Sequence, residues 1–468
     1  MFTPELLSPA GTLKNMRYAF AYGADAVYAG QPRYSLRVRN NDFSLENLKT
    51  GIQEAHSLNK KLYVVSNIAP HNGKLKTYIK DIQPVIAMQP DALIMSDPGL
   101  IMMVRETFPE QEIHLSVQAN AVNWASVKFW QQQGIKRVIL SRELSLDEIE
   151  EIRQRCPDIE LEVFVHGALC MAYSGRCLLS GYINKRDSNQ GTCTNACRWK
   201  YDAHPAQETL EGNIIATSPE VQQHTPHLTE HQQIHAPSND IFLLQEAGRP
   251  GEYMPAFEDE HGTYIMNSKD LRAIQHVERL AKMGIDSLKI EGRTKSFYYV
   301  ARTAQLYRQA INDASAGKDF NRALMHNLKG LAHRGYTEGF LRRHTHDAYQ
   351  NYDYGYSISD TQQFVGEFTG KYNELGMAEV DVKNKFSVGD SVEIMTPQSN
   401  LTLTIETLLN RKNETITSGL GSGHFVFLTL PTEVDIHKAI LLRNLPQGQN
   451  TRQPHAQNHQ DKARSSGF

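Results

Sequence analysis

The stretch ELLSPAGTLKNMRYAFAYGADAVYAG, residues 5–30, contains the unit from which the fold is built. An apolar run at 5–8 is followed by a helix-period segment at 13–22 and then by a second apolar run at 24–29. Short apolar runs that do not alternate with polar residues are typical of strands buried on both faces. A strand, a helix and a further strand in this order predict a parallel sheet covered by helices.

The same alternation continues through the first half of the chain. Further strands are predicted at 62–67, 92–96, 113–118, 137–141 and 161–166, and an eighth at 286–290. Helices are predicted between them at 45–58, 74–88, 100–107, 124–132, 146–155 and 269–283. Eight such units close a (β/α)8 barrel, whereas the competing doubly wound sheet would favour a G-x-G-x-x-G motif after the first strand, which is absent. We therefore predict an α/β fold with a TIM-like barrel over residues 1–316.

The rest of the chain divides into an insertion, a connecting segment and a second domain. The insertion, 167–267, follows the seventh strand, and its part at 203–240 is rich in His, Gln, Thr and Pro, which predicts no regular structure. A connecting segment is predicted at 317–357. Short alternating strands at 358–446 predict a small antiparallel β-barrel, and the polar end at 447–468 predicts a disordered tail.

Composition limits the classes of protein that fit. The 468 residues are 40% hydrophobic and 22% charged, as in globular proteins, and the formal net charge of -3 gives no whole-molecule attraction to nucleic acid. The first residues lack the pattern of a signal peptide, and no stretch is apolar enough to span a bilayer. A cytoplasmic location is therefore expected.

Four of the five cysteines lie close together, at Cys170, Cys177, Cys193 and Cys197. In a reducing compartment such a group indicates ligands or redox groups before disulfides. The spacing lacks the paired C-x2-C knuckles of zinc sites, whereas iron-sulfur clusters accept irregular spacing. The order of preference is a 4Fe-4S cluster, then zinc, then free thiols. The fifth cysteine, Cys156, is interpreted as structural.

Polar side chains follow the predicted strands, at the end of a barrel where catalysis takes place. The candidate catalytic residues are His166, Glu291 and Arg142. The candidate substrate-binding residues are Arg33, Tyr34, Arg37, Asn67, Gln118 and Arg293. The arginines around Tyr34 form a basic and aromatic mixture that suits anions or stacked bases.

Each candidate also has a purely structural interpretation. Glu291 paired with Arg293, or Arg142 paired with Glu143, would only brace the rim of the barrel. His166 would be a buried histidine whose hydrogen bonds are satisfied. Its position at a strand end, four residues before Cys170, favours a role at the site.

Four stretches resemble the collagenase-like peptidases of family U32. They are EVFVHGALCMAYSGRCLLS at 162–180, KIEGRTKS at 289–296, HRGYTEGFL at 333–341 and the opening stretch at 5–30. The resemblance covers nearly the whole chain, and it implies a chemistry that differs from the family's name. Members that resemble this chain over their full length are associated with prephenate-dependent formation of 5-hydroxyuridine at wobble uridine 34 of tRNA.

The resemblance also implies cofactors, partners and roles. The four cysteines would hold a 4Fe-4S cluster, with prephenate as co-substrate, the tRNA anticodon loop as partner and another protein as a possible electron donor. Arg142, Arg293 or the arginines beside Tyr34 would hold carboxylates or phosphates, and His166 and Glu291 would transfer protons. Tyr34 or Tyr173 would stack on the splayed base, and the C-terminal domain would dock the tRNA.

Two other functions remain open. A collagenase-like peptidase needs an activated nucleophile or a metal-bound water, and the strand ends show neither H-E-x-x-H nor a triad motif. A non-catalytic RNA-binding factor would use its metal only for folding. Hydroxylation of a pyrimidine carbon requires electron transfer, which a cluster supplies and ordinary side chains do not. We therefore favour the hydroxylase.

Overall fold

The computed structural model resolves the chain into two compact units, residues 1–325 with 333–357, and residues 326–332 with 358–468. The residues that the structure describes are 2–31, 33–35, 42–68, 70–168, 269–333, 335–342, 359, 361–431 and 433–445, with strands at 172–173, 176–177, 201–208, 214–216, 241–246, 253–259 and 262–264.

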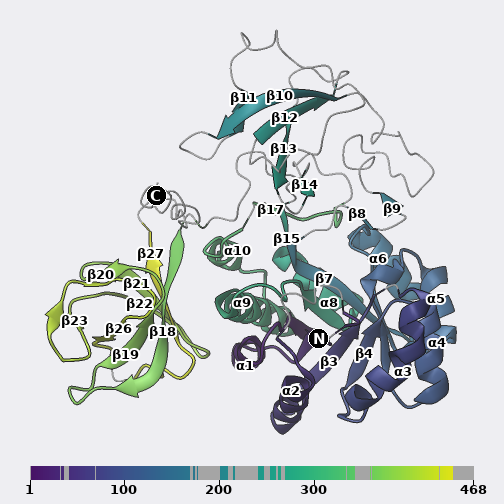
Figure 1. Cartoon of the computed structure of the whole chain (residues 1–468), viewed down its shortest axis with the longest axis horizontal. Helices are drawn as coiled ribbons and strands as arrows, with labels where there is room; N and C mark the ends of the chain where they lie inside the picture. Colours follow the sequence, from purple (N-terminus) through teal and green to yellow (C-terminus); the bar gives the residue numbers. More distant parts are fainter. Residues whose placement is uncertain are drawn as a thin grey trace, which may run out of the picture. The chain divides into compact units, whose positions relative to one another are not determined.

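The first unit is built on a closed barrel of eight parallel strands (Figure 1). They are β1 (Glu5–Pro9), β2 (Ala26–Gly30), β3 (Lys61–Ser66), β4 (Ala92–Met95), β5 (Ile113–Leu115), β6 (Arg137–Ile139), β7 (Glu160–Ala168) and β16 (Ser287–Ile290). Each strand pairs with the next, and β16 pairs with both β7 and β1, which closes the ring. The predicted (β/α)8 barrel is confirmed.

Helices cover the outside of the barrel. They are α1 (Leu13–Ala21), α2 (Leu45–Ser57), α3 (Asn72–Ile86), α4 (Pro98–Thr107), α5 (Trp124–Gln132), α6 (Leu146–Arg155), α8 (Val277–Met283) and α9 (Phe297–Ser315), followed by the short α10 (Ala323–Leu328). Most begin after a residue whose side chain accepts a hydrogen bond from the first turn, and Ser145 with Glu148 forms a complete capping box at α6. These short polar residues explain why several predicted helix starts are correct to the residue.

Charged side chains from four strands of the barrel meet inside it. Glu5 of β1 contacts Arg137 of β6 at 2.6 Å, and Arg137 also contacts Glu162 of β7 at 3.2 Å. Lys289 of β16 donates to Glu162 at 2.7 Å. Burial opposes ionisation of Glu162, but Lys289 and Arg137 outweigh it and hold the pKa of Glu162 below its usual value. The barrel is therefore held from within by an ion network, where aliphatic layers are the usual filling.

A bulge in the pairing of β7 with β16 changes the direction of His166. Lys289 is opposite Phe164, but the next residue, Ile290, is opposite His166, so Val165 is an extra residue in β7. Because side chains alternate along a strand, one extra residue sends His166 to the other face from Glu162 and Phe164.

Strand β7 continues beyond the barrel and pairs with an added strand. Strand β15 (Asp270–Arg272) runs antiparallel to it, and β17 (Tyr336–Thr337) runs parallel to β15. The helix predicted over 269–283 is wrong at its start, since residues 270–272 are extended, residues 274–276 form a 3-10 turn and α8 begins only at Val277. The reason is non-local, because the open edge of β7 offers backbone hydrogen bonds that outweigh the local helical pattern.

The insertion contains regular structure. Its five-stranded antiparallel sheet consists of β10 (Tyr201–Glu208), β11 (Ile214–Ala216), β12 (Ile241–Glu246), β13 (Tyr253–Asp259) and β14 (Gly262–Tyr264). The prediction of no regular structure over 203–240 is therefore wrong at β10 and β11. The main partner of β10 is β12, far along the chain, so the local pattern carried no sign of it. A two-stranded hairpin, β8 (Ala172–Tyr173) and β9 (Arg176–Cys177), precedes this sheet.

The second unit is an antiparallel β domain with its own core, as predicted in outline. Its main sheet contains β18 (Gln362–Tyr372), β19 (Ala378–Val382), β21 (Ser391–Met395), β22 (Asn400–Thr404), β23 (Leu408–Leu409), β24 (Thr415–Ile416), β26 (Phe425–Leu428) and β27 (Ile440–Asn444), with β20 (Phe386–Ser387) and β25 (Ser418–Gly419) as a separate pair. Val365, Val380, Ile394 and Leu441 are among the fully buried core residues. The predicted tail lies outside the described residues.

Candidate active site

Glu291 and Arg142 meet at the carboxyl end of the barrel. Arg142 Nη2 lies 3.5 Å from Glu291 Oε2, and its guanidinium sits 3.8 Å from the centre of the Phe164 ring. The Tyr28 hydroxyl donates to the Ile290 carbonyl at 2.9 Å and lies 3.4 Å from Glu291 Oε2. A guanidinium has five N–H donors, and among the described residues Arg142 makes only these two contacts. Arg142 is therefore able to take an anion in addition to Glu291.

Arg293 is fixed beside this pair by a close backbone approach. Its Nη1 donates to Ser35 Oγ at 2.7 Å, and its guanidinium lies 5.9 Å from the Tyr28 ring. Gly30, at the end of β2, has no side chain, and a Cβ there would collide with both Arg293 Nη1 and Ser35 Oγ. Glycine at this position is what admits the arginine to the rim.

Carboxamides occupy the opposite side of the strand ends. Asn67, directly after β3, donates to Gln118 Oε1 at 2.8 Å and to Ser116 Oγ at 3.3 Å. The Asn67 carbonyl in turn accepts from Ser96 Oγ at 3.0 Å. Residues following β3, β4 and β5 thus form one hydrogen-bonded group, in which carboxamides offer both donors and acceptors to a polar ligand.

His166 lies in a separate pocket made of tyrosines. Its ring contacts those of Tyr299 and Tyr307 from α9 and of Tyr336 from β17, with centroids 5.5 to 5.8 Å away. Tyr307 donates its hydroxyl hydrogen to the Val165 carbonyl at 2.6 Å, so at the 3.3 Å contact with His166 Nδ1 the histidine is the donor. The arrangement favours the tautomer with hydrogen on Nδ1, which leaves Nε2 as the basic nitrogen.

Gly167 separates the His166 pocket from the Glu291 pair. Its φ is +103°, and a Cβ there would lie 2.5 Å from the Glu291 carbonyl oxygen and 3.0 Å from the Tyr299 hydroxyl. The Tyr299 hydroxyl donates to that same carbonyl at 2.8 Å. A side chain at residue 167 would push apart the two groups of predicted catalytic residues.

Cations surround the His166 pocket. Arg272 of β15 lies opposite His166 in the sheet and places its guanidinium 4.8 Å from the Tyr336 ring. Arg272 Nε is buried without a hydrogen-bond partner among the described residues. Burial, followed by the nearby charges of Arg272, Lys295 and His333, lowers the pKa of His166 to about 3. His166 is therefore neutral at physiological pH.

The buried histidine predicts a pH dependence of stability. The folded protein keeps His166 neutral, whereas the unfolded chain protonates it below about pH 6.5, so stability falls as the pH drops from 6.5 towards 3. Between about pH 7.5 and pH 5 the wild type should lose about 2 kcal/mol more of its unfolding free energy than His166→Gln. Urea unfolding at both pH values measures the difference. If the unfolding free energies of the two proteins changed equally with pH, the buried neutral state of His166 would be contradicted.

The loop after β2 contacts α3 through its side chains, and Tyr34 is buried there. Arg33 Nη1 and the Tyr34 hydroxyl both bind Asp81 Oδ2, at 2.8 and 2.6 Å, and the Tyr34 ring packs edge-on against Tyr78. Tyr34 is 1% exposed, so in this state its ring offers no face for a base to stack on. Arg37 lies outside the described residues.

The predicted cysteine ligands are largely beyond the described chain. Cys170, Cys193 and Cys197 lie outside it, and Cys177 is placed only as the second residue of β9. In the hairpin, Cys177 is opposite Ala172, two residues after Cys170. The chain therefore turns back between the second cysteine and the neighbourhood of the first.

Several residues at the site were missed by the sequence reasoning. Glu162 and Lys289 could have been recognised from the sequence, since each is a charged residue inside an otherwise apolar strand, LEVFV and SLKI. Lys289 Nζ lies 4.3 Å from the centre of the Tyr28 ring and so links the interior network to the mouth. Arg272 and Tyr336 carried no local signal, because they reach His166 only through the added strands β15 and β17.

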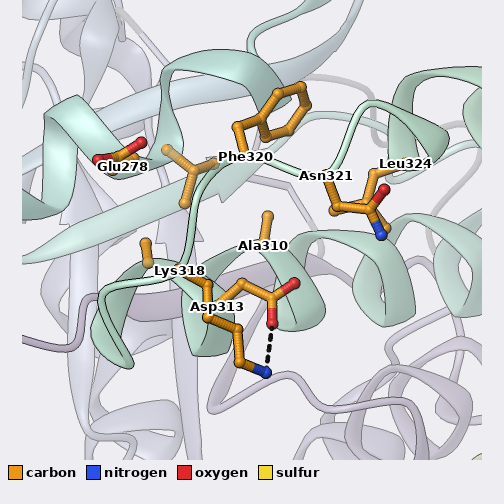
Figure 2. A pocket seen from close by; sticks show the side chains of 9 residues that line it. Glu278, Ala310, Asp313, Lys318, Phe320, Asn321 and Leu324 are labelled. Carbon is orange, nitrogen blue, oxygen red and sulfur yellow. Dashed lines mark hydrogen bonds and ion pairs between the residues drawn. The ribbon is translucent and has the colours of Figure 1, made fainter.

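A small pocket lies elsewhere, in the helical layer. Figure 2 shows it between α8, α9 and the segment leading into α10, with Phe320 and Leu324 in its wall and the Asp313–Lys318 ion pair, 3.4 Å, at its edge. None of the strand-end residues lines it. This pocket is separate from the candidate active site.

Comparison with protein families agrees with the architecture. The model of peptidase family U32 matches residues 11–351, and that of the U32 C-terminal domain matches residues 360–443. The chain belongs to peptidase family U32. Among the described residues no helix has both the length and the apolar character of a membrane span.

Similar proteins carry names that refer to RNA hydroxylation. The chain is 70% identical to tRNA hydroxylation protein P of Haemophilus influenzae, over 97% of this chain and 99% of that protein. It is 69% identical to tRNA hydroxylation protein P of Escherichia coli, over 97% and 100%. It is 28% identical to the 23S rRNA 5-hydroxycytidine C2501 synthase of Escherichia coli, over 84% of this chain and 52% of that one.

Proposed function

We propose that this protein hydroxylates tRNA, forming 5-hydroxyuridine at wobble uridine 34 with prephenate as co-substrate. The observation that carries the proposal is the 70% identity to a tRNA hydroxylation protein, which extends over 99% of that protein's length. A more distant relative is named for 5-hydroxycytidine formation in ribosomal RNA. Uridine and cytidine are both pyrimidines, so the same type of ring carbon would be hydroxylated.

The cations at the barrel mouth support an anionic co-substrate. Prephenate has two carboxylates, and Arg142 and Arg293 present planar forks that match a carboxylate in two hydrogen bonds. Arg142 has donors beyond its 3.5 Å contact with Glu291. The carboxamides of Asn67 and Gln118 suit the polar edge of a uracil, which also combines donors and acceptors.

Glu291 is our candidate for the proton transfer. Replacing C5–H of uracil by C5–OH is a two-electron oxidation in which an oxygen donor supplies the new oxygen and accepts the electron pair, while C5 loses its hydrogen as a proton. The proposal assigns this chain the proton, which a carboxylate at the mouth is able to accept. Arg142 holds Oε2 of Glu291 in position at 3.5 Å, and the Tyr28 hydroxyl oxygen lies 3.4 Å from the same atom. His166 has its ring among tyrosines, and we propose that it positions the end of β7 and the chain that leads to Cys170.

The cofactor of the proposal is a 4Fe-4S cluster held by Cys170, Cys177, Cys193 and Cys197. Such a cluster supplies one-electron transfer, which the side chains at the mouth lack. In the sequence, Cys170 is only two residues beyond the end of β7, the strand that ends at the barrel mouth. The β8–β9 reversal, which pairs Cys177 with Ala172, suits ligands that converge on one group. We propose a cytoplasmic protein that receives electrons from a partner protein.

The nucleosides of tRNA test the function. In a strain that lacks this protein and any parallel hydroxylase, 5-hydroxyuridine and its derivatives should disappear from tRNA digests analysed by mass spectrometry. The wild-type gene should restore them, and Glu291→Gln should restore them about 100-fold less efficiently. The exposed Glu106→Gln serves as control and should act as wild type.

Two outcomes would contradict the proposal. One is unchanged tRNA nucleosides in the deletion strain. The other is sustained cleavage of gelatin by the pure protein that Glu291→Gln abolishes, which would favour a peptidase.

A further inference from the structure

We propose that three exposed lysines of α3, Lys74, Lys76 and Lys80, together called here the α3 lysine face, bind the phosphate backbone of the RNA substrate. The inference rests on the proposed function, and it assigns the docking surface that this function requires. Phosphate contacts supply most of the non-specific affinity of proteins for nucleic acid, and lysines without partners are suited to make them.

The three lysines are exposed and form no ion pair among the described residues. Lys76 and Lys80 are one turn apart, on the side of α3 opposite the buried Tyr78 and Ile82. Lys74 is in the first turn, four residues before Tyr78, and it is exposed there beside the start of the helix. Like charges four residues apart destabilise a helix slightly. No other helix in the described barrel carries three lysines that lack a carboxylate partner, so α3 presents an unusual concentration of free positive charge.

The one acidic residue on this helix does not neutralise its lysines. The carboxylate of Asp81 is occupied by Arg33 at 2.8 Å and by the Tyr34 hydroxyl at 2.6 Å. The Arg33 side chain, 64% exposed, offsets the charge of Asp81, so the net positive charge at α3 is that of its three lysines. Hydrogen bonds from Tyr34 and Thr77, followed by Arg33, lower the pKa of Asp81, so the contact persists at physiological pH.

The α3 lysine face is close to the candidate active site. Strand β3 ends at Ser66, Asn67 follows at the rim, and α3 begins only a few residues later, at Asn72. In a barrel of this kind each helix starts at the rim where its strand ends. α3 packs between α2 and α4 in the outer layer (Figure 1), and the side that bears Lys76 and Lys80 is exposed. RNA bound along this side passes the mouth, where a base is able to enter.

The C-terminal domain is the alternative RNA-binding surface, and its net charge disfavours that role. Residues 358–446 contain seven Lys and Arg against eleven Asp and Glu, a formal charge of -4. A negatively charged domain repels phosphates at long range. The docking role expected for this domain from its position in the chain therefore lacks electrostatic support, and the α3 lysine face is the better candidate.

A matched pair of triple variants tests the proposal. In one, Lys74→Gln, Lys76→Gln and Lys80→Gln are combined; in the control, Lys371→Gln, Lys385→Gln and Lys412→Gln remove three exposed charges from the C-terminal domain. Both proteins lose the same charge and should keep the wild-type melting temperature. Fluorescence anisotropy with labelled unmodified tRNA should show about a 30-fold rise in Kd for the α3 variant and a salt slope lower by about 2 to 3. The control should match wild type.

Each other outcome has a definite meaning. Equal Kd values for the α3 variant and wild type would overturn the α3 lysine face, even where tRNA nucleosides confirm the hydroxylase. Weakened binding in the control alone would move docking to the C-terminal domain. The α3 variant could also bind tRNA normally but lose the turnover that a reducing protein supports. That result would assign the lysines to an acidic protein partner instead of RNA. Absence of tRNA binding by wild type at low salt would overturn both proposals.

Discussion

Replacing Glu162 by alanine should lower the unfolding free energy of the barrel by about 3 to 5 kcal/mol. Glu162 is fully buried and bridges Lys289 at 2.7 Å and Arg137 at 3.2 Å. Arg137 retains Glu5, but Lys289, 3% exposed, forms no other ion pair with the described residues and would keep an unpaired charge inside the barrel. Urea unfolding followed by tryptophan fluorescence measures the change, since all three tryptophans lie within residues 1–316.

Two controls separate the buried charge from a general loss of packing. The double variant Glu162→Met with Lys289→Met should recover most of the loss, because apolar side chains of similar volume replace a buried ion pair at little cost. Glu151→Ala removes an exposed pair with Arg155 and should cost at most about 0.5 kcal/mol. A Glu162→Ala protein within about 1 kcal/mol of wild type, or a double variant as unstable as the single one, would contradict the network's role.

Replacing Cys177 by alanine should abolish both the metal content and the product. In our proposal Cys177 is one of four thiolates around a 4Fe-4S cluster, and its replacement removes one of the four protein bonds to the iron. Anaerobically purified Cys177→Ala should therefore contain iron and sulfide only at background levels. Its gene should fail to restore 5-hydroxyuridine in the deletion strain.

Cys156 provides the matched control. It is a buried free thiol at the end of α6, with Sγ 3.5 Å from the Trp124 carbonyl, and burial raises its pKa. Cys156→Ala should keep the wild-type content of iron and sulfide. Retention of both by Cys177→Ala would remove Cys177 from the ligand set. Loss of the folded barrel together with the metal would indicate a structural metal.

The helices and strands of the barrel could be predicted from local sequence patterns because local residues, such as helix caps, determine where they begin. The predicted helices at 124–132 and 146–155 coincide with α5 and α6, and Asn123 and Ser145 cap them from the preceding position. The failed helix start at 269 and the unpredicted strand β10 have partners far along the chain. Periodicity records only which face of a segment is buried, not which other segment buries it.

The candidate site likewise has a part that local sequence predicts and a part that depends on distant segments. Glu291, Arg293, Asn67 and Gln118 were found because the barrel places any residue that follows a strand at the catalytic rim. Their partners, such as Tyr28 for Glu291 and Ser35 for Arg293, come from other strands and loops. No spacing rule gives those contacts, so the roles of the individual residues remained open at the sequence level.

The sequence by itself determined the barrel, the second domain, the crowding of four cysteines after the seventh strand and the polar residues at the strand ends. Only the tertiary structure decided where His166 points and what fills the barrel. A bulge arises from the pairing of β7 with β16, so it moves His166 to the tyrosines of α9 without any mark in the strand itself. Glu162 and Lys289 are each an unfavourable buried charge when taken singly, and they are tolerated only because closure of the barrel brings them together as a pair.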